Sequence, residues 1–236
     1  MAKNLNHNQP TLATGLAIAI GEFKDTSAID KFGYNPSVGA SYETIWDQGG
    51  TYAYLSSAQQ LTATSAAGAT DDGVEVSIQG LDANWEEQTV TVTLGATGVA
   101  TTTETFRRIF RAFVSNGQEA QGDIAISYDG VTYAYIETEF QQTMMAVYTV
   151  PAGKTAYVLS GNLSTLKDKD CTAKLMMRRD GGVFRAAGLI MTSGAAFQRQ
   201  WSVPPSVPAK TDIEIRAKTG ATGPVSAGFE IILVDA

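Results

Sequence analysis

The chain has almost none of the side chains from which most enzyme and metal sites are built. Among its 236 residues there is one cysteine, Cys171, and one histidine, His7. One cysteine excludes an internal disulfide, and a zinc site made of such ligands is nearly excluded. A Ser-His-Asp or Cys-His arrangement would have to recruit His7 from a polar amino-terminal segment. We therefore predict no catalytic residue, no bound metal and no cofactor, and we expect Cys171 as a small buried side chain in a strand.

Charged side chains are also scarce, at 17% of the chain, and acidic residues outnumber basic ones to give a net charge of −7. A sequence-independent grip on DNA or RNA needs clustered lysine and arginine, so we predict no nucleic-acid partner. The polar surface has to come largely from threonine, serine, glutamine, asparagine and glycine. Such a surface suits contacts between proteins better than electrostatic steering.

Long apolar runs are missing near the amino terminus. The apolar patch at residues 12–20 is nine residues long, whereas a helix needs about 20 residues to cross a bilayer. Only Lys3 precedes this patch, and charged residues follow it directly, which does not fit a secretion signal. We predict neither a membrane span nor a secretion signal.

The ending of a phosphate-binding loop occurs at residues 153–155 (GKT), but the rest of that motif is absent. A P-loop needs a glycine five residues before the Gly-Lys pair, where this chain has Tyr148, and a helix that begins at the threonine. The residues that follow, 156–161 (AYVLSG), are typical of a strand. Pro151 and Gly153 suit a turn, so the pattern predicts strand, turn, strand and no nucleotide site.

The feature that the chain does have is alternation of apolar and polar side chains, which is the period of a β-strand. It is clear at residues 74–79, 89–94 and 212–217. Two alternating runs also flank Asp129-Gly130, the strongest short signal for a hairpin. Turn residues recur at intervals typical of sandwiches and jelly rolls. We predict an all-β fold with two β-sandwich or jelly-roll domains preceded by an extended amino-terminal arm.

The segment FRRIFRAF, residues 106–113, fits two periods. Its apolar residues have helical spacing, but the threonines before it disfavour a helix, so we predict a strand. Alternation would then place Phe106, Arg108 and Phe110 on one face, with Arg107 and Arg111 on the other. Cation–π packing or a partner contact is one explanation of the arginines, and apolar stems with solvated heads are the other.

The first 45 residues show no sustained alternation, yet they carry more apolar side chains than a solvated tail normally does. We predict an arm, residues 1–45, that becomes ordered along its own domain or along a neighbouring subunit. A β-sandwich domain at residues 46–143 and a jelly-roll-like β-sandwich domain at residues 144–236 follow it. The apolar residues that we expect to contact a partner are Leu12, Leu16, Ile18, Ile20, Phe23, Ile29, Phe32 and Tyr34.

Three groups of residues are weak candidates for chemistry. Glu137 and Glu139 would lie about 7 Å apart on one face of a strand, a separation similar to that in inverting glycosidases. The explanation that we prefer is two charges on a solvated face at a strand end. Residues 85–87 (WEE) suit a sugar-stacking platform or, as we prefer, a turn that buries one aromatic ring. The charged loop at residues 167–170 (KDKD) lacks the acidic ladder and the glycine of an EF-hand.

From residue 31 to the end, the chain resembles a group of virion structural proteins of tailed bacteriophages, especially phages of aquatic bacteria and cyanobacteria. The resemblance lies in phrases that occur in order rather than in a catalytic motif. It implies a β-rich protein that assembles in many copies by side-to-side contact, and it implies no site residue. The phrases are KFGYNPSVGASYETIWDQGGTYAYL, GLDANWEEQTVTVTLGA, FRRIFRAFVSNG, QTMMAVYTVPAGKTAYV, GGVFRAA and KTDIEIRAK.

The function implied first is a non-enzymatic capsid decoration or cement protein, which stabilises the head by binding the major capsid protein. Its other partners would be further virion proteins and copies of itself, with a trimer as one form of homo-oligomer. It would be located in the virion, assembled in the host cytoplasm. A tail, neck or fibre component that contacts the host surface is the alternative. A carbohydrate-binding module or glycosidase that uses Glu137 and Glu139 is the third hypothesis.

Overall fold

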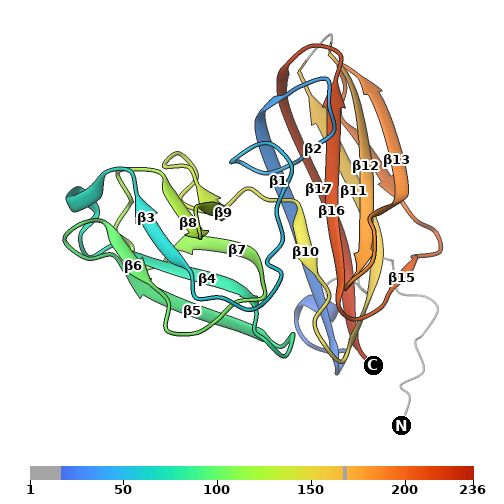
Figure 1. Ribbon diagram of the computed structural model, residues 1–236. Coiled ribbons are helices and arrows are strands. Elements are labelled where there is room, and N and C mark those ends of the chain that lie inside the picture. Colours follow the sequence, from blue (N-terminus) through green and yellow to red (C-terminus); the bar gives the residue numbers. More distant parts are fainter. Residues whose placement is uncertain (1–16, 167–168) are drawn as a thin grey trace.

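The computed structural model describes residues 17–166 and 169–236. Within them the protein is built from antiparallel strands in four sheets, with a short 3-10 helix, η1 (Gly68–Asp71). The prediction of an all-β class is confirmed. The sheets gather in two lobes, seen side by side in Figure 1. We call residues 51–144 lobe I, and residues 26–50 together with 145–236 lobe II.

Lobe I consists of one sheet in the order β6-β3-β8-β9 and a second in the order β5-β4-β7. Apolar side chains of both sheets, including the fully buried Ile78 and Ile126, share one core. The core forms because alternation places one face of each sheet toward the other. The strands are β3 (Thr62–Ser65), β4 (Glu75–Leu81), β5 (Glu87–Thr93), β6 (Val99–Thr101), β7 (Arg108–Val114), β8 (Ile124–Tyr128) and β9 (Val131–Ile136).

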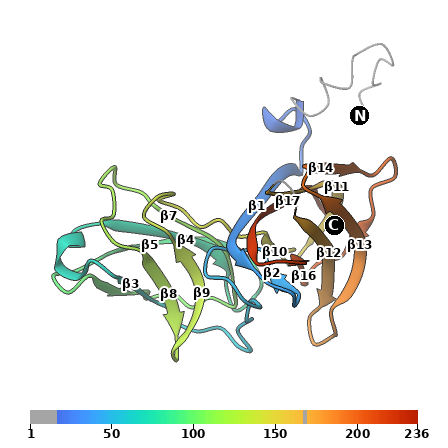
Figure 2. The same ribbon diagram turned by 90° about the horizontal axis from the view of Figure 1, so that it is seen from above.

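Lobe II consists of a sheet in the order β1-β17-β11-β14, with β15 also on β11, and a sheet in the order β10-β16-β12-β13, with β2 also on β16. The two sheets enclose a second core of buried apolar side chains. Figure 2 shows the strands of these two sheets from above. Cys171 lies in this core, 2% exposed, as expected. The strands are β1 (Thr26–Val38), β2 (Glu43–Thr44), β10 (Val147–Thr149), β11 (Lys154–Thr165), β12 (Asp170–Arg179), β13 (Arg185–Ser193), β14 (Phe197–Gln200), β15 (Ser206–Val207), β16 (Thr211–Thr219) and β17 (Gly223–Asp235).

Lobe I is an insertion between the second and the next strand of lobe II. The chain leaves lobe II after β2 and returns to it at β10. Its two connecting segments run side by side: Trp46 and Met145 form an antiparallel bridge, and Ala146 N–H donates to Ile45 O at 2.9 Å. Ile45 N–H in turn donates to Ile215 O of β16 at 2.9 Å, which ties the entry point to the lobe II sheet.

The segment predicted as an arm contains two strands of lobe II. β1 pairs with β17 from Thr26 opposite Val234 to Val38 opposite Gly223, so this part of the arm lies along its own chain. The alternation test missed β1 because its buried positions include Lys31, Gly33 and Asn35, which are not apolar. How the chain divides into domains at residues 45 and 143 stays a prediction.

The apolar residues predicted to contact a partner are spread over different environments. Leu12 and Leu16 lie outside the described residues. Before β1, Ile18 is half-buried in a short helical segment, Ile20 is exposed in the turn that follows it, and Phe23 is half-buried. Within β1, Ile29 packs against the lobe II core, Phe32 is exposed, and Tyr34 meets Phe140 edge to face with ring centroids 6.0 Å apart. They do not form one continuous contact surface on β1.

Both predicted turns, at Asp129-Gly130 and at Pro151, are present, but the second does not join two strands of one sheet. Asp129 and Gly130 both have positive φ, 49° and 74°, and they close the hairpin between β8 and β9. This is the backbone that a two-residue hairpin turn requires. The strand, turn, strand pattern around Pro151 is also present. Its two strands, however, lie in different sheets, so the turn joins the two layers of lobe II rather than closing a hairpin.

The segment FRRIFRAF is a strand, as predicted, but its faces differ from simple alternation. A β-bulge opposite the pair Gln79/Gly80 leaves Phe110 as the extra residue on β7. As a result, Ile109 and Ala112, which are three residues apart, are both buried in the lobe I core. A bulge places two residues against one on the partner strand, and it therefore shifts the face of every residue beyond it.

We expect Gly33→Ala to lower the melting temperature by several degrees, because a Cβ at Gly33 would lie 2.5 Å from Ala146 N and closer still to Ile45 O. Such overpacking costs about 1–3 kcal/mol, and about 2–4 °C per kcal/mol is expected at this chain length. Gly161→Ala is the control, since its Cβ would make only ordinary contacts at 3.6 Å or more. Equal melting temperatures for the two variants would contradict the tight packing of β1.

Candidate functional site

The two glutamates proposed as a catalytic pair do not lie on a strand. Glu137 and Glu139 follow the end of β9 in a turn, so the premise that residues i and i+2 share a strand face is wrong here. The pKa of Glu137 is raised, first by burial and then by the charges of Asp123 and Glu139. Partial burial beside two other carboxylates explains this shift without a substrate.

The aromatic turn at residues 85–87 buries its ring, as we preferred from the sequence. Trp85 is 5% exposed and has a positive φ of 68°. The guanidinium groups of Arg107 and Arg108 lie 4.6 and 4.9 Å from its ring centroid, which is cation–π geometry. The ring is therefore covered by cations and is not available as a platform for a sugar.

The loop predicted from KDKD lies partly outside the described residues, at 167 and 168. Among the residues that the structure describes, no group of three or more His, Cys, Asp and Glu side chains is placed to hold a metal ion. In that same part of the chain, no helix is both long and apolar enough to cross a membrane.

The largest concentration of buried charge lies where lobe I meets lobe II. Asp212 on β16 is completely buried, and it accepts hydrogen bonds from Arg108 Nε at 2.7 Å and from an Arg178 terminal nitrogen at 2.6 Å. Thr149 Oγ1 donates to the same carboxylate at 2.7 Å. Because Arg108 belongs to β7 of lobe I and the other groups to lobe II, this carboxylate joins the two lobes.

A second buried carboxylate extends the junction. Glu214, two residues further along β16, accepts hydrogen bonds from Tyr54 Oη at 3.1 Å and from Thr44 Oγ1 at 3.3 Å, and it pairs with Arg216. Burial raises the pKa of Glu214, and the charge of Arg216 opposes this shift. Both carboxylates have their partners, which is the condition under which charge is tolerated in a protein interior.

Sequence reasoning identified the alternation of residues 212–217 but not the burial of its polar face. Ile213 and Ile215 point into the lobe II core, and Asp212 and Glu214 point the other way. Normally such a face is solvated, but lobe I covers it. The sequence does show arginines in the otherwise apolar strand β7 and carboxylates in β16. It does not show which arginine pairs with which carboxylate.

We expect Asp212→Ala to destabilise the protein by about 3–5 kcal/mol, because two arginines lose a buried counter-charge. At this chain length the melting temperature should fall by about 10 °C. Asp235→Ala is the control, since its pair with Lys154 lies at the surface and should contribute less than about 1 kcal/mol. Comparable losses in the two variants, measured by thermal melting, would show that the junction is not a buried contact.

Lys31 on β1 is a buried cation at the same junction. It is 8% exposed and donates to Phe110 O of lobe I. Burial, reinforced by the nearby Arg111, lowers the pKa of Lys31 to about 7, against the opposing effect of Asp30 and Asp47. The folded protein therefore binds fewer protons than the unfolded chain between pH 7 and the ordinary lysine pKa of 10.5.

It follows that the Lys31 contribution to stability rises as pH increases through this window. We expect the difference in unfolding free energy between the wild type and Lys31→Met to change by about 3 kcal/mol from pH 7 to pH 10. Lys154→Met, at a lysine paired on the surface, should follow the wild type. Urea denaturation at several pH values measures both. A constant difference for Lys31→Met across the window would refute the burial of the Lys31 amino group.

Exposed apolar side chains occur on two edge strands of lobe II, one in each of its sheets. The edge strand β13 carries Leu189, 48% exposed, and Met191, 70% exposed. The edge strand of the other sheet, β14, carries Phe197, 45% exposed. Figures 1 and 2 both place β13 at the far side from lobe I. We call Leu189, Met191 and Phe197 the free-side cluster.

No protein-family model matches the chain, and no curated protein matches it. Partial likeness exists to a solved structure of infectious bursal disease virus Gt strain, with 12% identity, a TM-score of 0.26 and coverage of 90% of this chain and 73% of that one. T=1 particles derived from infectious bursal virus give 12% identity, a TM-score of 0.25 and coverage of 90% and 70%. The VP2 subviral particle of the same virus gives 12% identity, a TM-score of 0.24 and coverage of 90% and 72%. With TM-scores this low, the likeness defines neither a shared fold nor a shared function.

Proposed function

We propose that the chain is a non-enzymatic structural component of a virus particle that works through contacts between proteins. The observation that carries the proposal is the free-side cluster on two strand edges. β13 pairs only with β12, and β14 pairs only with β11, so each has an edge without a partner strand in the described residues. Proteins usually protect such edges with charge or cover, because an open apolar edge accepts another chain.

The strand order of lobe II supports a jelly roll. The strands of lobe II pair in a nested order, with the earliest strand next to the latest. β1 pairs with β17, β10 with β16, β11 with β14, and β12 with β13. This is the pairing of a long hairpin rolled into two facing sheets. Jelly rolls of this kind occur in viral capsid proteins, and also in lectins and cupins, so the topology alone does not decide function.

Within this role we propose a capsid decoration or cement protein of a tailed phage. The resemblance of its sequence to virion proteins of such phages supports the assignment. A protein that binds only the assembled shell stabilises that shell by mass action, without any catalytic group. The partners would be the major capsid protein and further copies of this chain. A tail, neck or fibre component is the alternative within the same particle.

We expect Met191→Glu to weaken binding to purified phage heads at least 10-fold, because the substitution places a charge in an apolar contact. Val99→Glu is the control, since Val99 is an exposed apolar residue of β6 in lobe I. Co-sedimentation with heads measures attachment, and analytical ultracentrifugation measures association between copies. If Met191→Glu changes neither quantity, the free-side cluster is not the contact.

The number of copies per particle separates the two locations in the virion. Hundreds of copies, counted by quantitative mass spectrometry of purified particles, support a head protein. A few to a few dozen copies point to the tail, neck or fibre and contradict the cement assignment. Absence from the particle would refute the virion role as a whole.

A further inference from the structure

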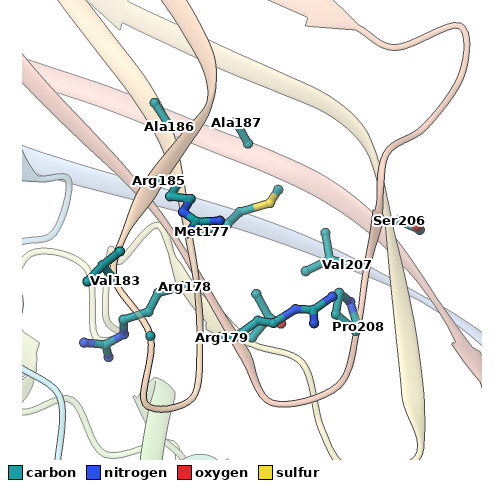
Figure 3. Close-up of a pocket in the computed structure, with 12 residues that line it drawn as sticks. Met177, Arg178, Arg179, Val183, Arg185, Ala186, Ala187, Ser206, Val207 and Pro208 are labelled. Atoms are coloured by element: carbon teal, nitrogen blue, oxygen red, sulfur yellow. The ribbon is translucent and has the colours of Figure 1, made fainter.

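A cavity of about 410 Å³ opens at one end of lobe II, and Arg178 of the junction is among the residues that line it. It lies between the hairpin that joins β12 to β13 and the segment that runs from β15 into β16. Figure 3 shows the side chains that line it, with Val207 and Pro208 facing Arg179. Apolar walls and a few cationic groups therefore share one opening.

The sheet register places two arginines on the interior face of the sheet at this opening. Arg179 is directly opposite Thr211, and Met177 is opposite both Ile213 and Arg185. Because Ile213 belongs to the core, its neighbours on the same face, Arg179 and Arg185, also point between the two sheets. Both side chains remain exposed at the mouth of the cavity, so an anion from solution can reach them.

Within the described residues, no carboxylate pairs with either of these two exposed arginines. Neither Arg179 nor Arg185 makes a salt bridge, whereas Arg178, on the opposite face, is bound to Asp212. Figure 3 shows Arg178 extending in the opposite direction from Arg179. The sheet therefore has a carboxylate, Asp212, on the face where Arg178 lies. The face with Arg179 and Arg185 has no carboxylate paired with them in the described residues.

A third polar group in the cavity is also without a partner. Thr211 is 3% exposed and lines the cavity, and its Oγ1 is buried without a hydrogen-bond partner. A buried hydroxyl that makes no hydrogen bond costs about 1–3 kcal/mol. An acceptor brought in from outside would remove this cost, and Arg179 and Arg185 line the same cavity.

We propose that this cavity binds a carboxylate side chain of an extended acidic segment from another polypeptide. The planar guanidinium group matches a carboxylate with two parallel N–H donors, and Thr211 Oγ1 is a further donor. The apolar wall formed by Met177 and Val207 suits the methylene groups of an aspartate or glutamate. A polypeptide is favoured over a free anion because Arg185 and Ala186, which line the cavity, belong to β13, whose unpaired edge accepts an added strand.

This site does not depend on the virion role. A partner that is not viral would use it in the same way, and the test therefore uses a synthetic probe. The probe is a fluorescent ten-residue peptide in which glutamate alternates with valine, and a second peptide with lysine in place of glutamate is its counterpart. Fluorescence anisotropy with the full-length protein measures binding, at low and at physiological salt.

We expect the acidic peptide to bind and the lysine peptide not to bind. Arg179→Gln and Arg185→Gln should each weaken binding of the acidic peptide at least 10-fold. Arg199→Gln is the matched control, because Arg199 is an exposed arginine of β14 that does not line this cavity. Circular dichroism and melting temperature verify that the variants are folded, which is expected because Arg179 and Arg185 are exposed.

Thr211→Val separates a binding role from a structural one. Valine has nearly the same shape and lacks the unpartnered hydroxyl, so the melting temperature should stay the same or rise, while binding of the acidic peptide weakens. No binding of the acidic peptide would overturn the proposal, as would equal weakening by Arg199→Gln. Binding of inorganic phosphate or glucuronate that depends on Arg179, without binding of the peptide, would overturn the assignment to a polypeptide.

Discussion

The arrangement of the two lobes depends on one buried carboxylate. Asp212 is removed from water, and the free energy lost with its hydration is recovered only if its donors are all in place. Those donors come from β7 in lobe I and from β10 and β12 in lobe II. A small rotation of either lobe would leave a charge without its partner. The ion pairs therefore specify the orientation of the lobes, which an apolar contact of the same area would leave less strictly defined.

This junction also determines which surface of lobe II is available to other molecules. Lobe I covers the polar face of β16 and contacts β1 through Lys31. The opposite side, with β13 and β14, has no such cover in the described chain. Lobe II thus has one side committed to its own chain and one side with open strand edges. A molecule that attached to these open edges would have lobe I on the far side of lobe II.

The sequence was sufficient for the fold class, the tight turn at Asp129-Gly130 and the burial of Trp85 and Cys171. Each follows from local chemistry: the period of the side chains, a backbone with positive φ, or an apolar side chain in a strand. The sequence was not sufficient where a distant segment decides the environment. β1 was missed because its inward residues meet lobe I and the turn at Ile45 rather than an apolar core. The bulge at Phe110 was missed because alternation assumes that no residue is inserted.

The buried charges were the hardest to predict for the same reason. Alternation along β16 correctly separated Ile213 from Asp212, but it could not tell whether the polar face meets water or another lobe. Likewise, Glu137 and Glu139 would form a pair of carboxylates on one face only if they lay on a strand, and they lie in the turn after β9. The arginines of the cavity, Arg179 and Arg185, are ordinary surface residues by composition, and only the strand register places them on one interior face.

The bridge between Trp46 and Met145 brings the start and the finish of lobe I together on the body of lobe II. A unit whose two ends are adjacent can be shortened, enlarged or exchanged while the host sheets keep their pairing, because the gap that it leaves is small. Lobe I is therefore an inserted unit that can be replaced without a change in the strand pairing of lobe II.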